Sequence, residues 1–217
     1  MKTIILDFDG TIADTRTSII ETVRQTLQVL NLPTADVNEV REVIGLPLRD
    51  TFVKAAHIQD EALINKAMQT YRSLYNGVSL RTVRLFPHVA DTLRVLHDTG
   101  VTLTVASSKG REALGMLLDV LGISPYISCV FGEQDVANKK PAPDMVLHIL
   151  ERTNTRAEDA LVVGDTWFDI AMGRSAGCPT CGVSYGNHSV GQLREAGADF
   201  IIDDFTAILD IQKGGRG

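Results

Sequence analysis

The chain has 217 residues, of which 44% are hydrophobic and 22% charged, and its formal net charge is −6. This apolar content suffices for a globular protein with a packed core, and the length allows one large domain or two unequal ones. The negative charge argues against nucleic acid or anionic membranes as the main partner, because both attract cationic proteins. An anionic substrate would therefore need a local cationic site.

No apolar stretch is long enough to cross a bilayer. Asp7 and Asp9 interrupt the apolar N-terminal run too early for a signal peptide, so we expect a cytoplasmic protein. Three cysteines, Cys129, Cys178 and Cys181, are too few for a disulfide framework. The last two have C-x-x-C spacing, but they lie in a strand-like run. One such pair is a weak zinc signal, so burial as small apolar side chains is the preferred interpretation.

The first predicted element is a buried strand at residues 4–6, followed at once by Asp7-Phe8-Asp9-Gly10-Thr11. In open α/β sheets ligands bind at the carboxyl ends of the strands. The chain therefore delivers Asp7 and Asp9 to a position suited to ligand binding. Two carboxylates this close destabilise each other unless a cation lies between them or one of them takes up a proton.

Residues 15–84 show helical periodicity and no convincing strand. The apolar pattern predicts a long helix that ends near residue 31, a second at 37–44, a short third near 48–55 and a fourth at 63–76, stopped by Asn76-Gly77. An antiparallel bundle is the natural way to bury their apolar stripes. This block follows immediately after the two carboxylates.

From residue 85 onward, strand-like runs at 101–106, 129–131, 160–163, 180–184 and 198–202 alternate with helical patterns, and the tail from Lys213 is expected to be disordered. Such alternation predicts a parallel sheet wrapped by helices. The predicted fold class is therefore α/β: a Rossmann-like core of residues 1–14 and 85–217, with residues 15–84 inserted as an all-helical cap.

Four predicted strand ends carry complementary polar residues. They are Asp7 and Asp9, then Ser107 and Ser108 with Lys109, then Lys140, and finally Asp165 with Asp169 one helical turn later. Each residue alone has a structural explanation, as a helix cap or a solvated charge. Their shared position at the carboxyl ends of parallel strands favours an active site.

These motifs resemble those of the haloacid dehalogenase superfamily of phosphatases, in particular its phosphoglycolate phosphatase-like branch. The matching segments are Asp7-Phe8-Asp9-Gly10-Thr11, residues 105–109, residues 140–144, and residues 163–165 with Asp169. The resemblance implies that Asp7 is the nucleophile, Asp9 the general acid/base and Asp165 a Mg²⁺ ligand. It also implies a helical cap inserted after the first motif.

Physical chemistry supports these roles. A carboxylate that attacks a phosphate ester needs a hard cation between the two anions, and Mg²⁺ suits carboxylate and carbonyl oxygens. The expected ligands are Asp7, the backbone carbonyl of Asp9, Asp165 and, directly or through water, Asp169. Ser107 and Lys140 are expected to hold the phosphate oxygens, and Ser108 is a further candidate contact for the substrate.

Three segments depart from the family pattern or extend it. Family members often have Thr-Asn where this chain has Ser107-Ser108, and the serine keeps a hydroxyl at this position. Pro87-His88-Val89 stands where Pro-Gly-Val is common. His88 is interpreted as a helix-start residue. Residues 45–49 resemble the cap turn that members direct at the substrate, so Arg49 is a candidate ligand for a second anionic group, although an exposed surface position fits it equally well.

The leading hypothesis is a Mg²⁺-dependent phosphatase for a small phosphorylated metabolite, with phosphoglycolate as the first candidate. Alternatives on the same residues are an inorganic pyrophosphatase and a phosphosugar mutase of the β-phosphoglucomutase type. A metal-free dehalogenase is disfavoured because Asp9, Lys140 and Asp165 together would be superfluous in it. A non-catalytic protein is disfavoured because Asp7 and Asp9 are both present. We expect a monomer or dimer.

Overall fold

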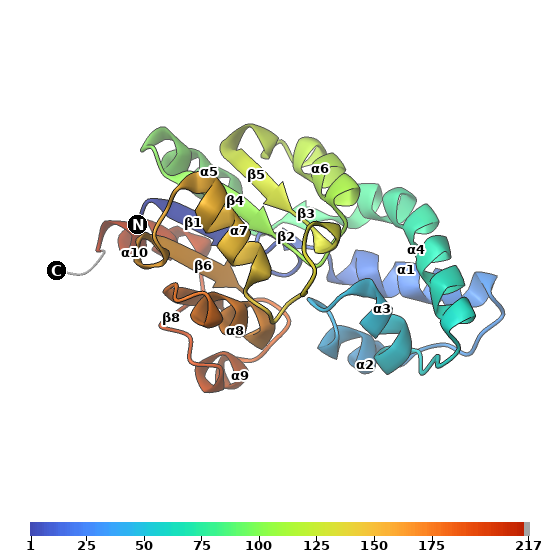
Figure 1. The fold of residues 1–217 in the computed structure, drawn as a ribbon. Helices are drawn as coiled ribbons and strands as arrows, with labels where there is room; N and C mark the ends of the chain where they lie inside the picture. Colours follow the sequence, from blue (N-terminus) through green and yellow to red (C-terminus); the bar gives the residue numbers. More distant parts are fainter. Residues whose placement is uncertain (215–217) are drawn as a thin grey trace.

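In the computed structural model, which describes residues 1–214, six strands form a parallel sheet in the order β5-β4-β1-β6-β7-β8 (Figure 1). The strands are β1 (Thr3–Leu6), β4 (Thr102–Ala106), β5 (Ile127–Phe131), β6 (Ala160–Gly164), β7 (Thr180–Val183) and β8 (Phe200–Ile202). The fold is the predicted Rossmann-like α/β architecture, with β1 in the interior of the sheet.

Helices cover both faces of the sheet because its strands are apolar on both sides. In β1, Ile5 packs into the core under α7 (Asp144–Thr153) and α8 (Trp167–Ser175), whereas Ile4 and Leu6 point into the opposite core. That second core is covered by α5 (Val89–Asp98), α6 (Arg111–Val120) and α10 (Ile208–Lys213). The remaining helix of this part is α9 (Val190–Glu195).

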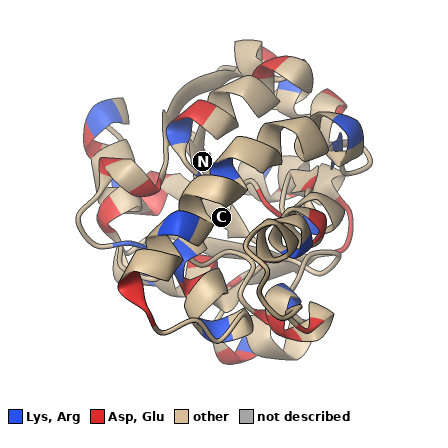
Figure 2. Cartoon of the chain, turned by 90° about the vertical axis from the view of Figure 1, so that its right-hand side faces the viewer, with Lys and Arg blue, Asp and Glu red and all other residues tan. Residues whose placement is uncertain are grey.

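The helical block lies to one side of the sheet (Figure 1). It consists of α1 (Arg16–Val29), α2 (Val37–Glu42), α3 (Leu48–Asp50), a π-helical turn at Thr51–Ala55 and α4 (Glu61–Thr82), with α1 packed along α4. Two short strands, β2 (Ala13–Asp14) and β3 (Arg84–Leu85), pair antiparallel at its base. Figure 2 views this side and shows acidic and basic residues interspersed over it.

The predicted end of the fourth helix, at Asn76-Gly77, was wrong. Gly77 does not stop α4, which continues to Thr82, and Val78 and Ser79 beyond it are buried. Glycine costs a helix roughly 1 kcal/mol relative to alanine, and burial of the following turn outweighs this cost. The predicted disordered tail also begins too early, because α10 includes Lys213; residues 215–217 lie outside the described residues.

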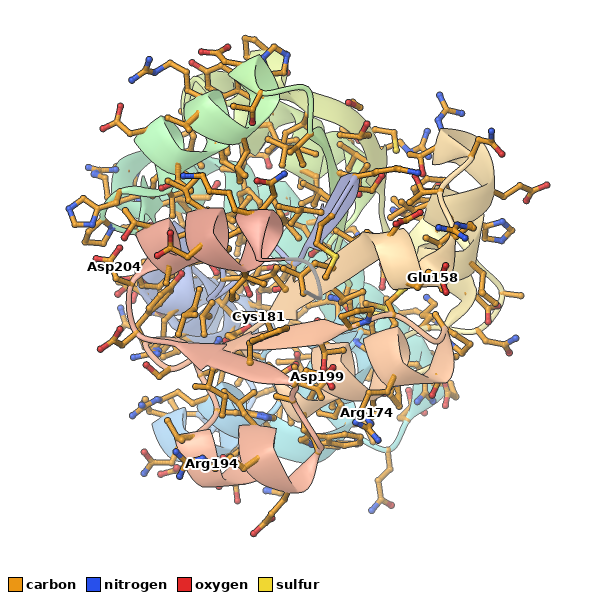
Figure 3. All side chains as sticks on the ribbon, turned by 90° about the vertical axis from the view of Figure 1, so that its left-hand side faces the viewer. Glu158, Arg174, Cys181, Arg194, Asp199 and Asp204 are labelled. Carbon is orange, nitrogen blue, oxygen red and sulfur yellow. The ribbon has the colours of Figure 1, made fainter. Side chains whose placement is uncertain are left out.

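The C-x-x-C pair lies in and beside β7, where Figure 3 labels Cys181. Cys178 and Cys181 are free and buried, and burial raises their pKa values to about 11 and about 12 respectively. Both thiols therefore stay protonated, as expected for small apolar side chains. Within residues 1–214, no helix has the length and apolarity needed to span a membrane.

Candidate active site

The carboxyl ends of β1, β4 and β6 lie side by side because β1 pairs with both other strands. Asp7 directly follows β1, Ser107 follows β4 and Asp165 follows β6. The Asp7 N–H donates to the carbonyl of Val163 at 2.9 Å, which continues the pairing one residue beyond β1. The strand register therefore brings three predicted site residues together, and all three are buried.

Lys140 is the central cation of this cluster. Its Nζ lies 2.6 Å from Asp7 Oδ1 and 2.7 Å from Asp169 Oδ1, and its side chain is fully buried. Burial alone would lower the pKa of Lys140, but Asp169 and Asp7 outweigh burial and raise this pKa above its ordinary value. Lys140 is thus a permanent positive charge at the edge of the sheet.

Asp165 is held by residues from two other segments. The backbone N–H and side-chain amide of Asn187 donate to its Oδ2 at 2.7 and 2.8 Å, and the Thr11 hydroxyl donates to its Oδ1 at 3.2 Å. Burial, followed by the like charge of Asp169, raises the pKa of Asp165 to about 7. Burial also raises the pKa of Asp7 well above its ordinary value, although Lys140 opposes this shift.

These carboxylates fit a divalent metal ion. Asp7, Asp165 and Asp169 each offer one oxygen, and the three oxygens lie within 4.8 Å of one another. Asp169 Oδ2 accepts hydrogen bonds from the N–H and hydroxyl of Thr166 at 3.1 and 2.6 Å, which fixes the orientation of this carboxylate. Three buried carboxylates against one lysine leave an excess of negative charge that a hard cation would neutralise.

Asp9 lies on the side of this cluster that faces a cavity. Its Oδ1 is 3.1 Å from Lys109 Nζ, and the same ammonium lies 4.2 Å from the centre of the Tyr75 ring on α4. Lys109 therefore bridges a core carboxylate and an aromatic residue of the helical block by an ion pair and a cation–π contact. Asp9 has room to exchange protons with a bound group because it lines a cavity.

The cavity has a volume of about 230 Å³ and lies between the helical block and the carboxyl ends of the strands. Ser107 and Ser108 both line it. The Ser107 oxygen accepts the N–H of Lys109 at 3.2 Å, whereas the Ser108 hydroxyl donates to the carbonyl of Gly45 at 2.7 Å. Ser108 thus links the core to the helical block in this structure, and its contact with a substrate stays a prediction.

The two remaining candidates lie apart from this cluster. Arg49 pairs with Glu61 on the exposed surface of the helical block, and the described residues that line the cavity do not include it. His88 lies at the start of α5 with φ +64°, and its Nδ1 is 2.7 Å from Asp204 Oδ2. This position fits the interpretation of His88 as a helix-start residue.

The position of Arg49 changes what we expect of its substitution. Arg49→Ala removes an exposed ion pair, and such pairs contribute little to stability. We therefore expect kcat/KM to change less than about threefold on both phosphoglycolate and an aryl phosphate. Steady-state phosphate release measures this. A tenfold loss confined to the anionic metabolite would instead support the sequence-based role of Arg49.

The sequence analysis assigned no role to Asn187 or Tyr75. Asn187 follows the strand-like run at 180–184, so its position after a further strand end was a usable signal. Tyr75 reaches the site from a helix remote in sequence, and the helical pattern of residues 63–76 gave no indication of this contact. Tyr71 and Tyr75 stack with ring centroids 5.4 Å apart, and both line the cavity.

Gly10 lies where the chain turns against the metal-ligand candidates. Its φ is +89°, and a Cβ at this position would collide with the side chains of Asp165 and Asn187. We expect Gly10→Ala to destabilise the protein by about 1–3 kcal/mol from backbone strain alone, and to displace Asp165. Denaturant unfolding and phosphate release measure the two effects. Gly115→Ala is the control, because that glycine has open space around it.

A sequence model of the haloacid dehalogenase-like hydrolases matches residues 4–183. The chain belongs to this family. The match contains β1, the helical block and all the strand-end residues of the site except those beyond β7. The site described above therefore belongs to a haloacid dehalogenase-like hydrolase.

Similar proteins place the chain among the phosphatases of this family. It is 33% identical to the Probable phosphatase IndB of Dickeya dadantii, over 95% of this chain and 91% of that protein. It is 31% identical to the phosphoglycolate phosphatase of Salmonella typhimurium, over 96% and 91%. The crystal structure of a predicted phosphoglycolate phosphatase from Haemophilus somnus superposes with a TM-score of 0.88 at 28% identity, over 97% of both chains. The protein is a phosphatase of the phosphoglycolate phosphatase-like branch.

Proposed function

We propose that this phosphatase hydrolyses a small phosphorylated metabolite with Mg²⁺, through an aspartyl-phosphate on Asp7. The position of the Asp7 carboxylate carries the proposal. It lies 2.6 Å from the buried ammonium of Lys140 and within a cluster completed by Asp165 and Asp169. A carboxylate held in this way is oriented as a nucleophile toward an anion that the same charges would bind.

The buried carboxylates support the metal part of the proposal. Asp7, Asp165, Asp169 and the backbone carbonyl of Asp9 would hold Mg²⁺. When bound, the ion would neutralise negative charge on the phosphate oxygens. Lys140 and the Ser107 hydroxyl would hold these oxygens from the protein side, and the N–H groups after Asp7 would add further donors.

In the first step a carboxylate oxygen of Asp7 attacks phosphorus and the bond from phosphorus to the ester oxygen breaks. Asp9 acts as the general acid and gives a proton to the departing oxygen. Lys109 at 3.1 Å orients Asp9 toward the cavity where the leaving group lies. The products are an aspartyl-phosphate on Asp7 and a free alcohol.

In the second step Asp9, now a carboxylate, removes a proton from a water molecule. The water oxygen attacks phosphorus, the bond from phosphorus to Asp7 breaks, and inorganic phosphate leaves. Asp7 returns to its carboxylate form and Asp9 to its acid form. Covalent catalysis of this kind divides one slow hydrolysis into two faster reactions.

In this proposal the helical block excludes bulk water from the active site. We take residues 15–84 as a cap that hinges where β2 and β3 pair. The Ser108–Gly45 hydrogen bond and the Lys109–Tyr75 contact support a closed position of this cap. We further propose that the protein acts in the cytoplasm as a monomer or dimer. Its three free cysteines fit a reducing compartment.

The first experiment is phosphate release from p-nitrophenyl phosphate by the purified protein with Mg²⁺, followed by phosphoglycolate, pyrophosphate, hexose phosphates and nucleotides. Acid-quenched protein should carry phosphate on Asp7, identified by mass spectrometry after borohydride reduction. Transfer of that phosphate to a sugar phosphate, without release, would favour a mutase. Absence of any phosphate release would contradict the proposed function.

A further inference from the structure

The active-site cavity has two kinds of wall. Side chains of the helical block, including Ile44, Leu46 and Leu48, form an apolar wall, and the stacked rings of Tyr71 and Tyr75 form an aromatic one. The cavity volume of about 230 Å³ is many times what a single water molecule needs. A leaving group as small as glycolate would leave much of this apolar surface against water.

The cations that line the cavity are already paired with carboxylates, and the lining has an excess of negative charge. Among the described residues that line it, the cations are Lys109 and Arg72 and the carboxylates are Asp9, Glu112 and Glu133. Both cations already have carboxylate partners, because Lys109 lies 3.1 Å from Asp9 and Arg72 lies 3.0 Å from Glu133. The lining therefore offers no unpaired cation to a second anionic group of a substrate.

Glu133 is the decisive residue. Its side chain is only 5% exposed, and besides Arg72 from the helical block it lies 3.6 Å from Lys139. A second anionic group that binds Arg72 would share its guanidinium with the buried Glu133 and would therefore lie close to that carboxylate. Without Arg72, that group would be desolvated in a cavity with an apolar wall and would be repelled by Glu133.

We propose that the substrate is a phosphate monoester of an uncharged ring alcohol, such as a sugar or a nucleoside, and that Glu133 excludes leaving groups with a second negative charge. The ring packs between the apolar wall and the tyrosines, and its hydroxyls meet polar lining residues such as Thr51 and Asn76. This inference rests on the proposed function and narrows its substrate class. It disfavours phosphoglycolate and pyrophosphate, the candidates suggested by the sequence.

The substrate preference of the wild-type enzyme tests this inference. We measure kcat/KM with Mg²⁺ for ribose 5-phosphate and uridine 5′-monophosphate, for phosphoglycolate and pyrophosphate, and for glycerol 1-phosphate, which is uncharged apart from its ester phosphate but has no ring. We expect the better ring ester to exceed both anionic substrates and glycerol 1-phosphate at least tenfold, and the two ring esters distinguish sugar from nucleoside. Equal or faster turnover of phosphoglycolate, pyrophosphate or glycerol 1-phosphate would overturn the inference.

Two variants test the role of Glu133. Glu133→Gln removes the buried charge with little change of shape, so the ratio of kcat/KM for phosphoglycolate to that for the ring ester should rise at least tenfold. Glu112→Gln removes an exposed, screened charge from the same cavity and should change the ratio less than threefold. An unchanged ratio in folded Glu133→Gln, checked by thermal unfolding, overturns its selective role. If the wild type released no phosphate from p-nitrophenyl phosphate, this result would instead contradict the proposed function itself.

Discussion

Asp7→Asn is expected to lower phosphate release at least a thousandfold while leaving the fold intact. The amide has nearly the same shape but is a poor nucleophile, and it cannot form the aspartyl-phosphate through which the reaction would proceed. Stability should change little, because the substitution removes both the repulsion from two other buried carboxylates and the ion pair with the buried Lys140. The measurements are steady-state phosphate release and the midpoint of thermal unfolding.

Asp119→Asn is the matched control, since it makes the same chemical change at an exposed position near the end of α6. It should keep wild-type activity. If Asp7→Asn retained activity within tenfold of the wild type, Asp7 would not be the nucleophile. If instead Asp7→Asn lost activity together with its cooperative unfolding transition, the loss would reflect the fold, and kinetics of the folded fraction would then decide the assignment.

The sheet and the charged cluster could be predicted from the sequence because they depend on local signals. Apolar runs mark the parallel strands, and the carboxyl ends of such strands meet at one edge. Asp7 and Asp165 therefore had to lie close together once β1 and β6 were neighbours. Lys140 lies in a loop at the same edge of the sheet, where it is buried between Asp7 and Asp169.

The cavity could not be predicted in this way. Contacts such as Tyr75 with Lys109 and Arg72 with Glu133 join a helix of the inserted block to loops of the core, and no periodicity encodes which residues meet. Arg49 shows the converse: its turn resembled a substrate-binding segment, yet its side chain pairs with Glu61 at the surface. Local patterns therefore located the groups that we propose to act on phosphorus, whereas the surroundings of the proposed leaving group required the tertiary structure.

Removal of divalent metal is expected to abolish turnover, and Mg²⁺ should restore it. The candidate ligands Asp7, Asp165 and Asp169 repel one another, and Lys140 compensates only part of their charge. Dialysis against EDTA followed by titration with Mg²⁺, with phosphate release as the readout, tests this expectation. Ca²⁺ should inhibit, because its larger and less regular coordination sphere would misplace Asp7 relative to phosphorus.

The same cluster predicts how metal affects stability at different pH values. The pKa of Asp165 is about 7 in the folded protein, whereas an unfolded aspartate titrates near pH 4. Between these values the native state binds a proton that the unfolded state has lost, so the stability of the metal-free protein falls as pH rises from about 4 to 7. Mg²⁺ competes with this proton, so it should raise the unfolding midpoint more at pH 8 than at pH 5.5.

Full activity after EDTA dialysis, or an unfolding midpoint that Mg²⁺ leaves unchanged at pH 8, would contradict a metal site at these carboxylates.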